Sequence, residues 1–162
     1  MTRVFLSLGS NLGDRLSYLR SAAAALDLGP NMRVDGTSRI YETAPVEVEE
    51  EQPEYLNCVV EVECDIPAIE LMRYCQGVEA DLGRERKGEK APRTVDIDVL
   101  LFGEEVIKMQ DLTVPHPGIM RAFNLKGIAD IDPKVYIPGR GAAGDLLSAA
   151  DLDGVREFGE GL

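Results

Sequence analysis

Residues 91–103, APRTVDIDVLLFG, constrain this chain more than any other stretch. The β-branched and apolar residues between Pro92 and Gly103 predict a half-buried β-strand. Asp96 and Asp98 interrupt the apolar run, and because they stand two positions apart on a strand they point to the same face, with Cα atoms about 6.5 Å apart. A carboxylate pair held in this way can ligate one hard cation or bridge two, and Mg²⁺ typically takes one or two carboxylates plus substrate phosphates. This stretch is therefore the candidate chemical centre.

Positive charge gathers beside these aspartates. Residues 84–93 contain five Lys or Arg and two Glu, a local charge of +3, in a chain whose net charge is −12. A charge run of this kind is either an ordinary solvated loop or a loop that binds an anion, and the spacing leaves both readings open. The acidity of the whole chain argues against nucleic acid and anionic membranes as partners, because both require a broad basic face.

Length and cysteine content indicate a soluble protein of one domain. A chain of 162 residues predicts a single domain over residues 1–162, which can bury about two thirds of the surface of its unfolded form. Cys58, Cys64 and Cys75 show no C-x-x-C spacing, so they indicate neither a disulfide framework nor a zinc site. The apolar run at the N-terminus is too short for a signal peptide, and nowhere do 18 apolar residues follow one another. We therefore expect a cytoplasmic protein that binds neither a membrane nor nucleic acid.

Hydrophobic periodicity predicts an α+β fold. The expected strands cover residues 4–8, 32–43, 55–64 and 94–102, and the expected helices cover residues 15–27, 67–82, 119–129 and 145–152, the first of them capped by Asp14. The first six elements follow the order strand, helix, strand, strand, helix, strand. This is the order of a split βαβ, or ferredoxin-like, unit, in which an antiparallel sheet has helices packed on one face. We expect this core to end at about residue 138, with a glycine-rich C-terminal extension at 139–162 packed around it.

Two elements of this core carry polar residues placed to meet a ligand. The alternation of the strand at 55–64 turns Cys58 toward the core, so Tyr55 and Asn57 lie on the opposite face. Gln76 and Glu79 share one face near the end of the second helix. From spacing alone, Glu79 is either an ordinary solvated carboxylate or a contact to a ligand.

Two loops contain further candidate residues. His116, the single histidine of the chain, stands between two prolines, and a side chain held in this way is well placed to meet a ligand even though a lone histidine is more often structural. Gly9 and Gly13 lack the other residues of a phosphate-binding loop, so we interpret residues 9–14 as a structural turn.

Seven segments, in order along the chain, carry a resemblance to one family. They are LGSNL at 8–12, YETAP at 41–45, QPEYLN at 52–57, Glu79 with GRER at 83–86, PRTVDID at 92–98, LTVPH at 112–116 and RAF at 121–123. With these segments the chain resembles the 6-hydroxymethyl-7,8-dihydropterin pyrophosphokinase family from residue 8 to about 138. Members of that family transfer pyrophosphate from ATP to the hydroxymethyl group of the pterin, giving AMP and the pterin pyrophosphate in folate biosynthesis. The resemblance implies an ATP-dependent diphosphokinase whose partners are ATP and 6-hydroxymethyl-7,8-dihydropterin, and we expect it to be a monomer.

The resemblance also implies a role for each matching residue. Asp96 and Asp98 would hold two Mg²⁺ ions and, together with Arg84 and Arg86, make up the catalytic set. ATP would be bound by Gln76, Glu79, Arg93, Thr113, His116 and Arg121. The pterin would be bound by Thr43, Pro45, Val46, Tyr55, Asn57 and Phe123. The attack on the β-phosphorus of ATP would be direct and in line, assisted by the two ions.

The residue types suit these roles. Aromatic faces such as those of Tyr55 and Phe123 can stack on a flat heteroaromatic ring, and the Asn57 amide both donates and accepts, as the edge of a pterin requires. Guanidinium groups bind phosphate through two hydrogen bonds at once. Two other readings stay open from the residues alone. One is a different two-carboxylate nucleotidyltransferase, which leaves the pterin-like set without a role, and the other is a non-catalytic ferredoxin-like module that binds a nucleotide or a metal.

Overall fold

The centre of the fold is β1 (Thr2–Ser10), a nine-residue strand that lies between two antiparallel neighbours. A computed structural model describes residues 1–44, 53–83 and 94–162 of the chain. The strands of the main sheet are β1, β2 (Met32–Thr37), β3 (Tyr41–Thr43), β4 (Tyr55–Cys64), β5 (Asp96–Phe102) and β10 (Val155–Glu157). They follow the order β10-β3-β4-β1-β5, and β2 pairs with residues 60–64 of β4. All of these pairings are antiparallel, so the fold is of the α+β class.

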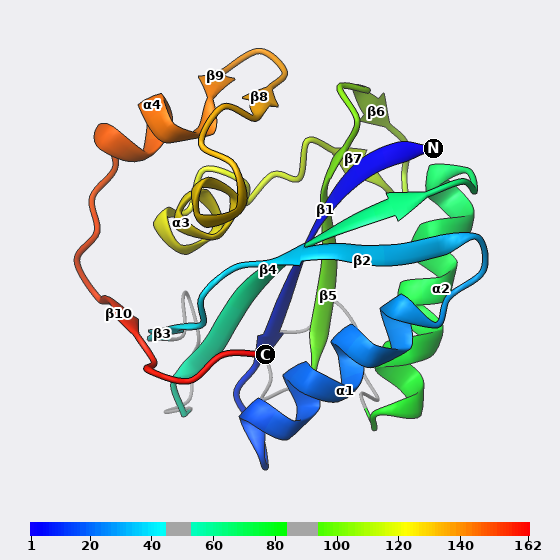
Figure 1. The fold of residues 1–162 in the computed structure, drawn as a ribbon, viewed down its shortest axis with the longest axis horizontal. Helices are drawn as coiled ribbons and strands as arrows, with labels where there is room; N and C mark the ends of the chain where they lie inside the picture. The colour runs from blue at the N-terminus through cyan, green and yellow to red at the C-terminus, as the bar shows by residue number, and fades with distance from the viewer. Residues whose placement is uncertain (45–52, 84–93) are drawn as a thin grey trace.

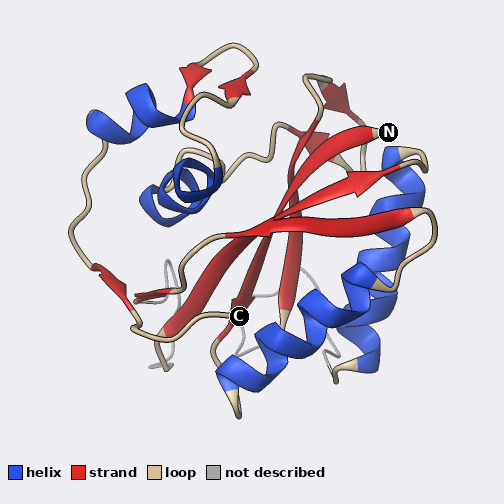
Figure 2. Cartoon of the chain, in the orientation of Figure 1, coloured by secondary structure: helices blue, strands red, loops and turns tan. Residues whose placement is uncertain are grey.

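Alternation along β1 sends its side chains into two separate cores. Val4, Leu6 and Leu8 lie in the larger core, under α1 (Arg15–Asp27) and α2 (Ala68–Asp81), whereas Phe5 lies in the smaller core, under α3 (Ala122–Ile131) and α4 (Ala143–Ser148). Figures 1 and 2 show α1 and α2 together on one side of the sheet and α3 with α4 on the other. Helices therefore cover both faces, whereas the sequence predicted a cover on one face. Among the described residues, no helix is both long and apolar enough to cross a membrane.

Two small ribbons complete the described fold. β6 (Ile107–Lys108) pairs with β7 (Thr113–Val114) beyond the end of β5, and β8 (Tyr136–Ile137) pairs with β9 (Gly141–Ala142) between α3 and α4. The second ribbon connects the two helices of the smaller core (Figure 1).

Several predicted elements are confirmed. The helix at 15–27 and the strand at 55–64 have the predicted bounds, and Asp14 caps the helix by accepting a hydrogen bond from the Ser17 N–H at 3.1 Å. Such a cap stabilises a helix by about 1 kcal/mol because it satisfies one of the exposed N–H groups of the first turn. The third helix begins at Ala122 and not at residue 119, since a turn comes first, with the Arg121 N–H donating to the Gly118 carbonyl.

The predicted strand at 32–43 is wrong in one respect, because the chain leaves the ladder in its middle. Ser38 lies between β2 and β3. Its hydroxyl accepts from the Val59 N–H at 2.8 Å and donates to the Arg39 carbonyl at 2.7 Å. A serine side chain that competes for backbone groups in this way interrupts regular structure. The sequence also gave no sign of β10, which pairs with β3 and adds a strand from the C-terminal extension to the sheet.

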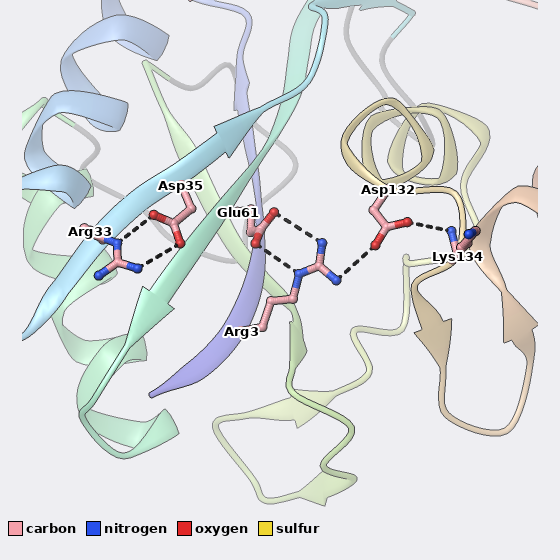
Figure 3. Close-up of polar contacts among 6 residues, drawn as sticks. All are labelled: Arg3, Arg33, Asp35, Glu61, Asp132 and Lys134. Atoms are coloured by element: carbon pink, nitrogen blue, oxygen red, sulfur yellow. Dashed lines mark hydrogen bonds and ion pairs between the residues drawn. The ribbon is translucent and has the colours of Figure 1, made fainter.

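An ion-paired network joins the sheet to the end of α3 (Figure 3). The Arg3 guanidinium on β1 donates to Glu61 on β4 at 3.0 Å and to Asp132, after α3, at 3.1 Å. A hydrogen bond from the Lys134 N–H lowers the pKa of Asp132 below its usual range, and the Arg3 guanidinium makes a smaller contribution in the same direction. Asp35, which pairs with Arg33 at 2.7 Å, lies near Glu61 in the same network. We interpret these acids as partners of the two arginines and not as a site.

The three cysteines are core residues, as predicted. Cys58, Cys64 and Cys75 are buried thiols in the larger core and form no disulfide. Burial raises the pKa of the Cys58 thiol to about 12. Burial also raises the pKa of the Cys64 thiol.

We expect these thiols to be unreactive in the folded protein. The thiolate is the reactive species, and burial suppresses both its formation and its access to reagent. With a chromogenic disulfide reagent at pH 8, the native protein should release almost no colour within minutes, whereas the same protein in guanidinium chloride should titrate three thiols. Rapid reaction of a thiol in the native protein would contradict the burial of Cys58, Cys64 and Cys75.

Candidate functional site

A row of residues in register crosses the sheet from β5 to β4. Asp96 on β5 is opposite Gly9 on β1, and Gly9 is opposite Asn57 on β4. Residues directly opposite one another in a ladder share a face, and two strand spacings separate Asp96 from Asn57 by about 10 Å. Their neighbours Ile97 and Cys58 point into the larger core. The row therefore lies on the face of the sheet opposite α1 and α2.

The predicted carboxylate pair is confirmed in its orientation. Ile97 is 2 % exposed and Val99 is 5 % exposed, because both pack into the larger core. Asp96 and Asp98 alternate with them, so both are half-buried on the opposite face. A β-bulge at the far end of the strand, opposite the step from Phe5 to Leu6, lies beyond both aspartates.

Gly9 is a buried residue of β1 between Asp96 and Asn57, and the Asn57 amide lies close against its backbone. A Cβ atom added at Gly9 would lie 3.1 Å from the Asn57 Oδ1 and 3.6 Å from the Tyr55 Cδ1. The first distance is tighter than ordinary van der Waals contact, so glycine is the residue that fits without displacing the amide. The turn predicted from residue 9 begins later, because Gly9 and Ser10 belong to β1. Spacing alone missed this position, although Gly9 lies in the segment 8–12 that carries the resemblance.

Beside Gly9, the predicted pterin residues of β3 and β4 come together. The Asn57 amide donates to the Thr43 hydroxyl at 2.7 Å, and both side chains are buried. Thr43 is opposite Tyr55, which is half-buried on the same face. Phe123 is half-buried in the first turn of α3, the helix on this side of the sheet. Pro45 and Val46 lie outside the described residues.

Glu79 is a buried carboxylate, so the solvated alternative is wrong. Its side chain is on α2, and the residue is 2 % exposed. Its Oε2 accepts from the N–H of Ile97, the residue between the two aspartates, at 2.9 Å. Glu79 thus joins α2 to β5 at the position where β5 carries Asp96 and Asp98.

A cleft of about 250 Å³ opens beside Asp98. It brings together four predicted residues, which are Gln76 from the exposed face of α2, Asp98 from β5, Thr113 from β7 and His116 from the loop that follows. The remaining walls are Met72, Cys75, Ile97, Val99, Gln110, Asp111, Leu112 and Pro117. Half of the lining residues are polar or charged, so the cleft can meet a polar ligand.

The loop after β7 aims His116 at the carboxylate pair. The His116 Nε2 lies 3.7 Å from the Asp98 Oδ1. The His116 Nδ1 accepts from the Gly118 N–H at 2.9 Å, so a neutral ring carries its proton on Nε2, the nitrogen that faces Asp98. A Cβ at Gly118 would lie 3.3 Å from the His116 Nδ1 and 3.4 Å from the Arg121 Nε. His116 and Arg121, both predicted to bind ATP, therefore flank one glycine.

Three predicted arginines cannot be placed. Arg84, Arg86 and Arg93 lie outside the described residues. The described residues supply a carboxylate pair, an amide and aromatic side chains on one side of it, and a cleft with a histidine on the other. Such an arrangement can hold a flat polar ring and an anionic chain on opposite sides of a cation site.

Comparisons with known proteins point to one family. The family model described as 7,8-dihydro-6-hydroxymethylpterin-pyrophosphokinase matches residues 5–133. The chain is similar to the 2-amino-4-hydroxy-6-hydroxymethyldihydropteridine pyrophosphokinase of Bacillus subtilis, with 42% identity over 132 residues that cover 81% of this chain and 78% of the relative. The protein of the same name from Pseudomonas aeruginosa is 32% identical over 157 residues, which cover 96% of each chain.

A likeness to a solved structure concerns the fold alone. The Plasmodium falciparum HPPK-DHPS wild type with pteroate aligns with a TM-score of 0.71 at 15% identity. The alignment covers 91% of this chain and 42% of the Plasmodium chain, so the present chain spans less than half of that protein.

We expect the hydrogen bond between Glu79 and the Ile97 N–H to stabilise the packing of β5 against α2. Glu79→Ala would leave the Ile97 N–H buried without its acceptor, and we expect it to lower the free energy of unfolding by about 1–3 kcal/mol. Gln76→Ala, at an exposed position on the same helix, should change it by less than about 0.5 kcal/mol. Glu79→Gln keeps an acceptor oxygen and should lose less than Glu79→Ala. Urea denaturation followed by circular dichroism measures all three, and equal stabilities of the two alanine variants would contradict the role of Glu79.

Proposed function

This chain belongs to the 7,8-dihydro-6-hydroxymethylpterin pyrophosphokinase family, and on that premise we propose that it transfers pyrophosphate from ATP to the hydroxymethyl group of 6-hydroxymethyl-7,8-dihydropterin. The products are AMP and the pterin pyrophosphate, and the reaction belongs to folate biosynthesis. One observation carries the proposal beyond the family likeness. The register of β5, β1 and β4 puts Asp96, Gly9 and Asn57 in one row, with the carboxylates at one end and the amide at the other.

The pterin is assigned to the β3 and β4 side of this row. The Asn57 amide, held by the Thr43 hydroxyl at 2.7 Å, presents its oxygen toward Gly9 and can meet the donor and acceptor edge of the ring. Tyr55 and Phe123 supply aromatic faces for stacking. Pro45 and Val46 complete the proposed set by their place in the matching segment. Because Gly9 has no side chain, the hydroxymethyl group can extend across β1 toward Asp96.

ATP is assigned to the opposite side. The cleft beside Asp98 offers Gln76, Thr113 and His116 to the nucleotide, and Arg121 lies next to His116 across Gly118. Glu79 belongs to this side as the support of β5. By their place in the matching segments, Arg93 is proposed to bind the triphosphate, and Arg84 and Arg86 to neutralise its charge as it reacts.

The residues present fit the two Mg²⁺ ions that the family likeness implies. Asp96 and Asp98 offer four carboxylate oxygens on one face, and hard oxygen donors with room for substrate phosphates are what Mg²⁺ prefers. When bound, such ions supply Lewis-acid stabilisation of the attacking and leaving oxygens. His116, 3.7 Å from the Asp98 Oδ1, can orient that carboxylate or meet a phosphate oxygen beside it.

The proposed reaction is a single displacement. The hydroxymethyl oxygen attacks the β-phosphorus of ATP, the bond from that phosphorus to the oxygen it shares with the α-phosphorus breaks, and AMP leaves. No covalent enzyme intermediate is needed, so the main contribution of the residues is orientation of two bound substrates. Effective molarities of about 10⁵ to 10⁸ M, equivalent to roughly 7–11 kcal/mol, are available from orientation.

Four finer points complete the proposal. We assign the core to the ferredoxin-like group because β5, β1, β4 and β2 follow one another in the sheet and α1 and α2 pack on a single face. We assign residues 1–162 to one domain with a C-terminal extension from 139. A cytoplasmic location is supported by the three buried thiols. A monomer is supported by large exposed apolar residues that lie in separate loops, such as Leu28 after α1 and Val106 before β6.

The reaction is tested by its products. We expect ATP, Mg²⁺ and the pterin to give AMP and pterin pyrophosphate by mass spectrometry. Asp96→Ala and Asp98→Ala should each lower the rate at least 10³-fold, because each removes a carboxylate proposed to hold the metal ions. Both variants should keep the wild-type circular dichroism spectrum, because these carboxylates lie outside the two cores. Glu104→Ala, an exposed carboxylate beyond the other end of β5, is the matched control and should keep the wild-type rate. Formation of ADP by the wild type would indicate an ordinary kinase, and absence of any product a binding module.

The division of the site is tested at Asn57. We expect Asn57→Ala to weaken pterin binding by about 10- to 100-fold, since an unpaired polar edge of the bound ring costs about 1–3 kcal/mol. Binding of a non-hydrolysable ATP analogue should change less than about threefold. Calorimetry with each ligand gives both constants, and an equal loss of both would refute the assignment of β4 to the pterin.

A further inference from the structure

Four charged residues connect the strands of the proposed pterin side to α1 and β10. They are Arg15, the first residue of α1, Glu42 on β3, Glu54 just before β4, and Arg156 on β10, and we call them the arginine–glutamate clamp. The Arg15 Nη1 donates to the Glu42 Oε2 at 2.8 Å and to the Glu54 carbonyl oxygen at 2.9 Å. The Arg156 Nη2 donates to the Glu42 Oε1 at 3.2 Å and to the Glu54 carboxylate. Each arginine therefore holds both glutamates.

The two glutamates stand next to the residues that face the pterin. Glu42 lies between Tyr41 and Thr43, and Glu54 precedes Tyr55. Thr43 is opposite Tyr55 in the β3 and β4 pairing, and it accepts the buried hydrogen bond from Asn57. Because Glu42 alternates with Thr43, its side chain points to the opposite face of the sheet. The clamp thus holds the ends of β3 and β4 from the face of the sheet opposite to the proposed pterin residues.

The C-terminal residues reinforce this arrangement. In the β10 and β3 pairing, Arg156 is directly opposite Glu42. The Phe158 N–H donates to the Ile40 carbonyl at 2.9 Å, and the Arg15 guanidinium lies 5.9 Å from the Phe158 ring centre, within cation–π range. β3 has only three residues, and without β10 it would form the edge of the sheet. β10 gives it a second paired neighbour.

Charge and exposure rank the members of the clamp. The Arg15 and Glu42 side chains are 25% and 22% exposed, whereas Arg156 is 57% exposed. Hydrogen bonding from Arg15, with a smaller contribution from Arg156, lowers the pKa of Glu42. Since exposed ion pairs contribute little and partly buried ones more, Arg15 is the stronger member and Arg156 the weaker.

We propose that the arginine–glutamate clamp is a positioning device for the pterin, in which Arg15 and Arg156 hold the ends of β3 and β4 so that Thr43, Tyr55 and Asn57 meet the ring in register. The inference rests on the proposed assignment of these three residues to the pterin. It gives the C-terminal extension a role in substrate binding, through the strand it adds beside β3. None of the four clamp residues needs to contact either substrate.

Four variants separate this role from a general loss of stability. Arg15→Ala should raise the Kd for 6-hydroxymethyl-7,8-dihydropterin by about three- to tenfold, and Arg156→Ala by about two- to fivefold, in keeping with partly buried and exposed ion pairs. Arg15→Lys keeps one charge contact to Glu42 and should recover part of the loss. Arg33→Ala is the matched control, because it removes an exposed arginine paired with Asp35 on β2, a strand that pairs with residues 60–64 of β4 and not with the end at 55–57.

Calorimetry decides the outcome, at a temperature well below the Tm of every variant. Support consists of a raised Kd for the pterin in Arg15→Ala and Arg156→Ala, an unchanged Kd for a non-hydrolysable ATP analogue, and wild-type constants in Arg33→Ala. The proposal is overturned if the pterin and nucleotide affinities fall together, or if Arg15→Ala and Arg33→Ala behave alike.

Amide hydrogen exchange gives a readout that does not depend on the ligand. Residues 41–43 and 55–57 should exchange faster in Arg15→Ala and Arg156→Ala than in the wild type and in Arg33→Ala. Unchanged exchange in these two segments overturns the clamp whatever the pterin measurements show. A wild-type protein that binds no pterin would instead overturn the proposed function, while the exchange data would still decide whether the clamp holds the two strands.

Discussion

The pairing of β1 with β4 and with β5 is the constraint on which the site depends. β1 contributes no charged side chain to the row, yet its register brings Asp96 and Asn57 to opposite sides of Gly9. The side-chain period of a strand is two, so a slip of one residue in either pairing would turn an entire strand over. Asp96 and Asp98 would then enter the larger core, and Ile97 and Val99 would face solvent. The apolar residues that fill the two cores therefore also hold the carboxylates in place, because they make such a slip costly.

Much of this architecture could be predicted from the residues. Strict alternation from Tyr55 to Cys64 gave the bounds of β4 and the inward direction of its cysteines, and Asp14 marked the start of α1. These features are local, since a strand face or a helix cap is decided by residues a few positions apart. The orientation of Asp96 and Asp98 was predictable for the same reason.

Contacts between distant segments could not be predicted in this way. Spacing left Glu79 as either a solvated carboxylate or a ligand contact, and it could not reveal that Glu79 accepts from the Ile97 N–H, 18 residues away. β10 has three residues in a glycine-rich extension, and its partner Glu42 is 114 residues from Arg156. The glycines of residues 9–14 predicted a turn that includes Gly9. Spacing along the sequence does not reveal that the Asn57 and Tyr55 side chains approach the position where a Cβ would lie. The resemblance to the pyrophosphokinase family reached several of these positions through matching segments, without giving the physical reason for them.

The close approach of the Asn57 amide to Gly9 has a consequence for inhibition. A ligand atom that lies over Gly9 contacts main-chain atoms, which a substitution cannot remove. Replacing the glycine would instead add a Cβ 3.1 Å from the Asn57 Oδ1, the side chain assigned to the substrate. Escape from an inhibitor at this point would therefore displace the same amide that the enzyme needs, so resistance and loss of activity would arise from one change. Ligands that extend from the pterin pocket across β1 should for this reason be harder to evade than ligands that depend on exposed side chains such as Gln76 or Arg121.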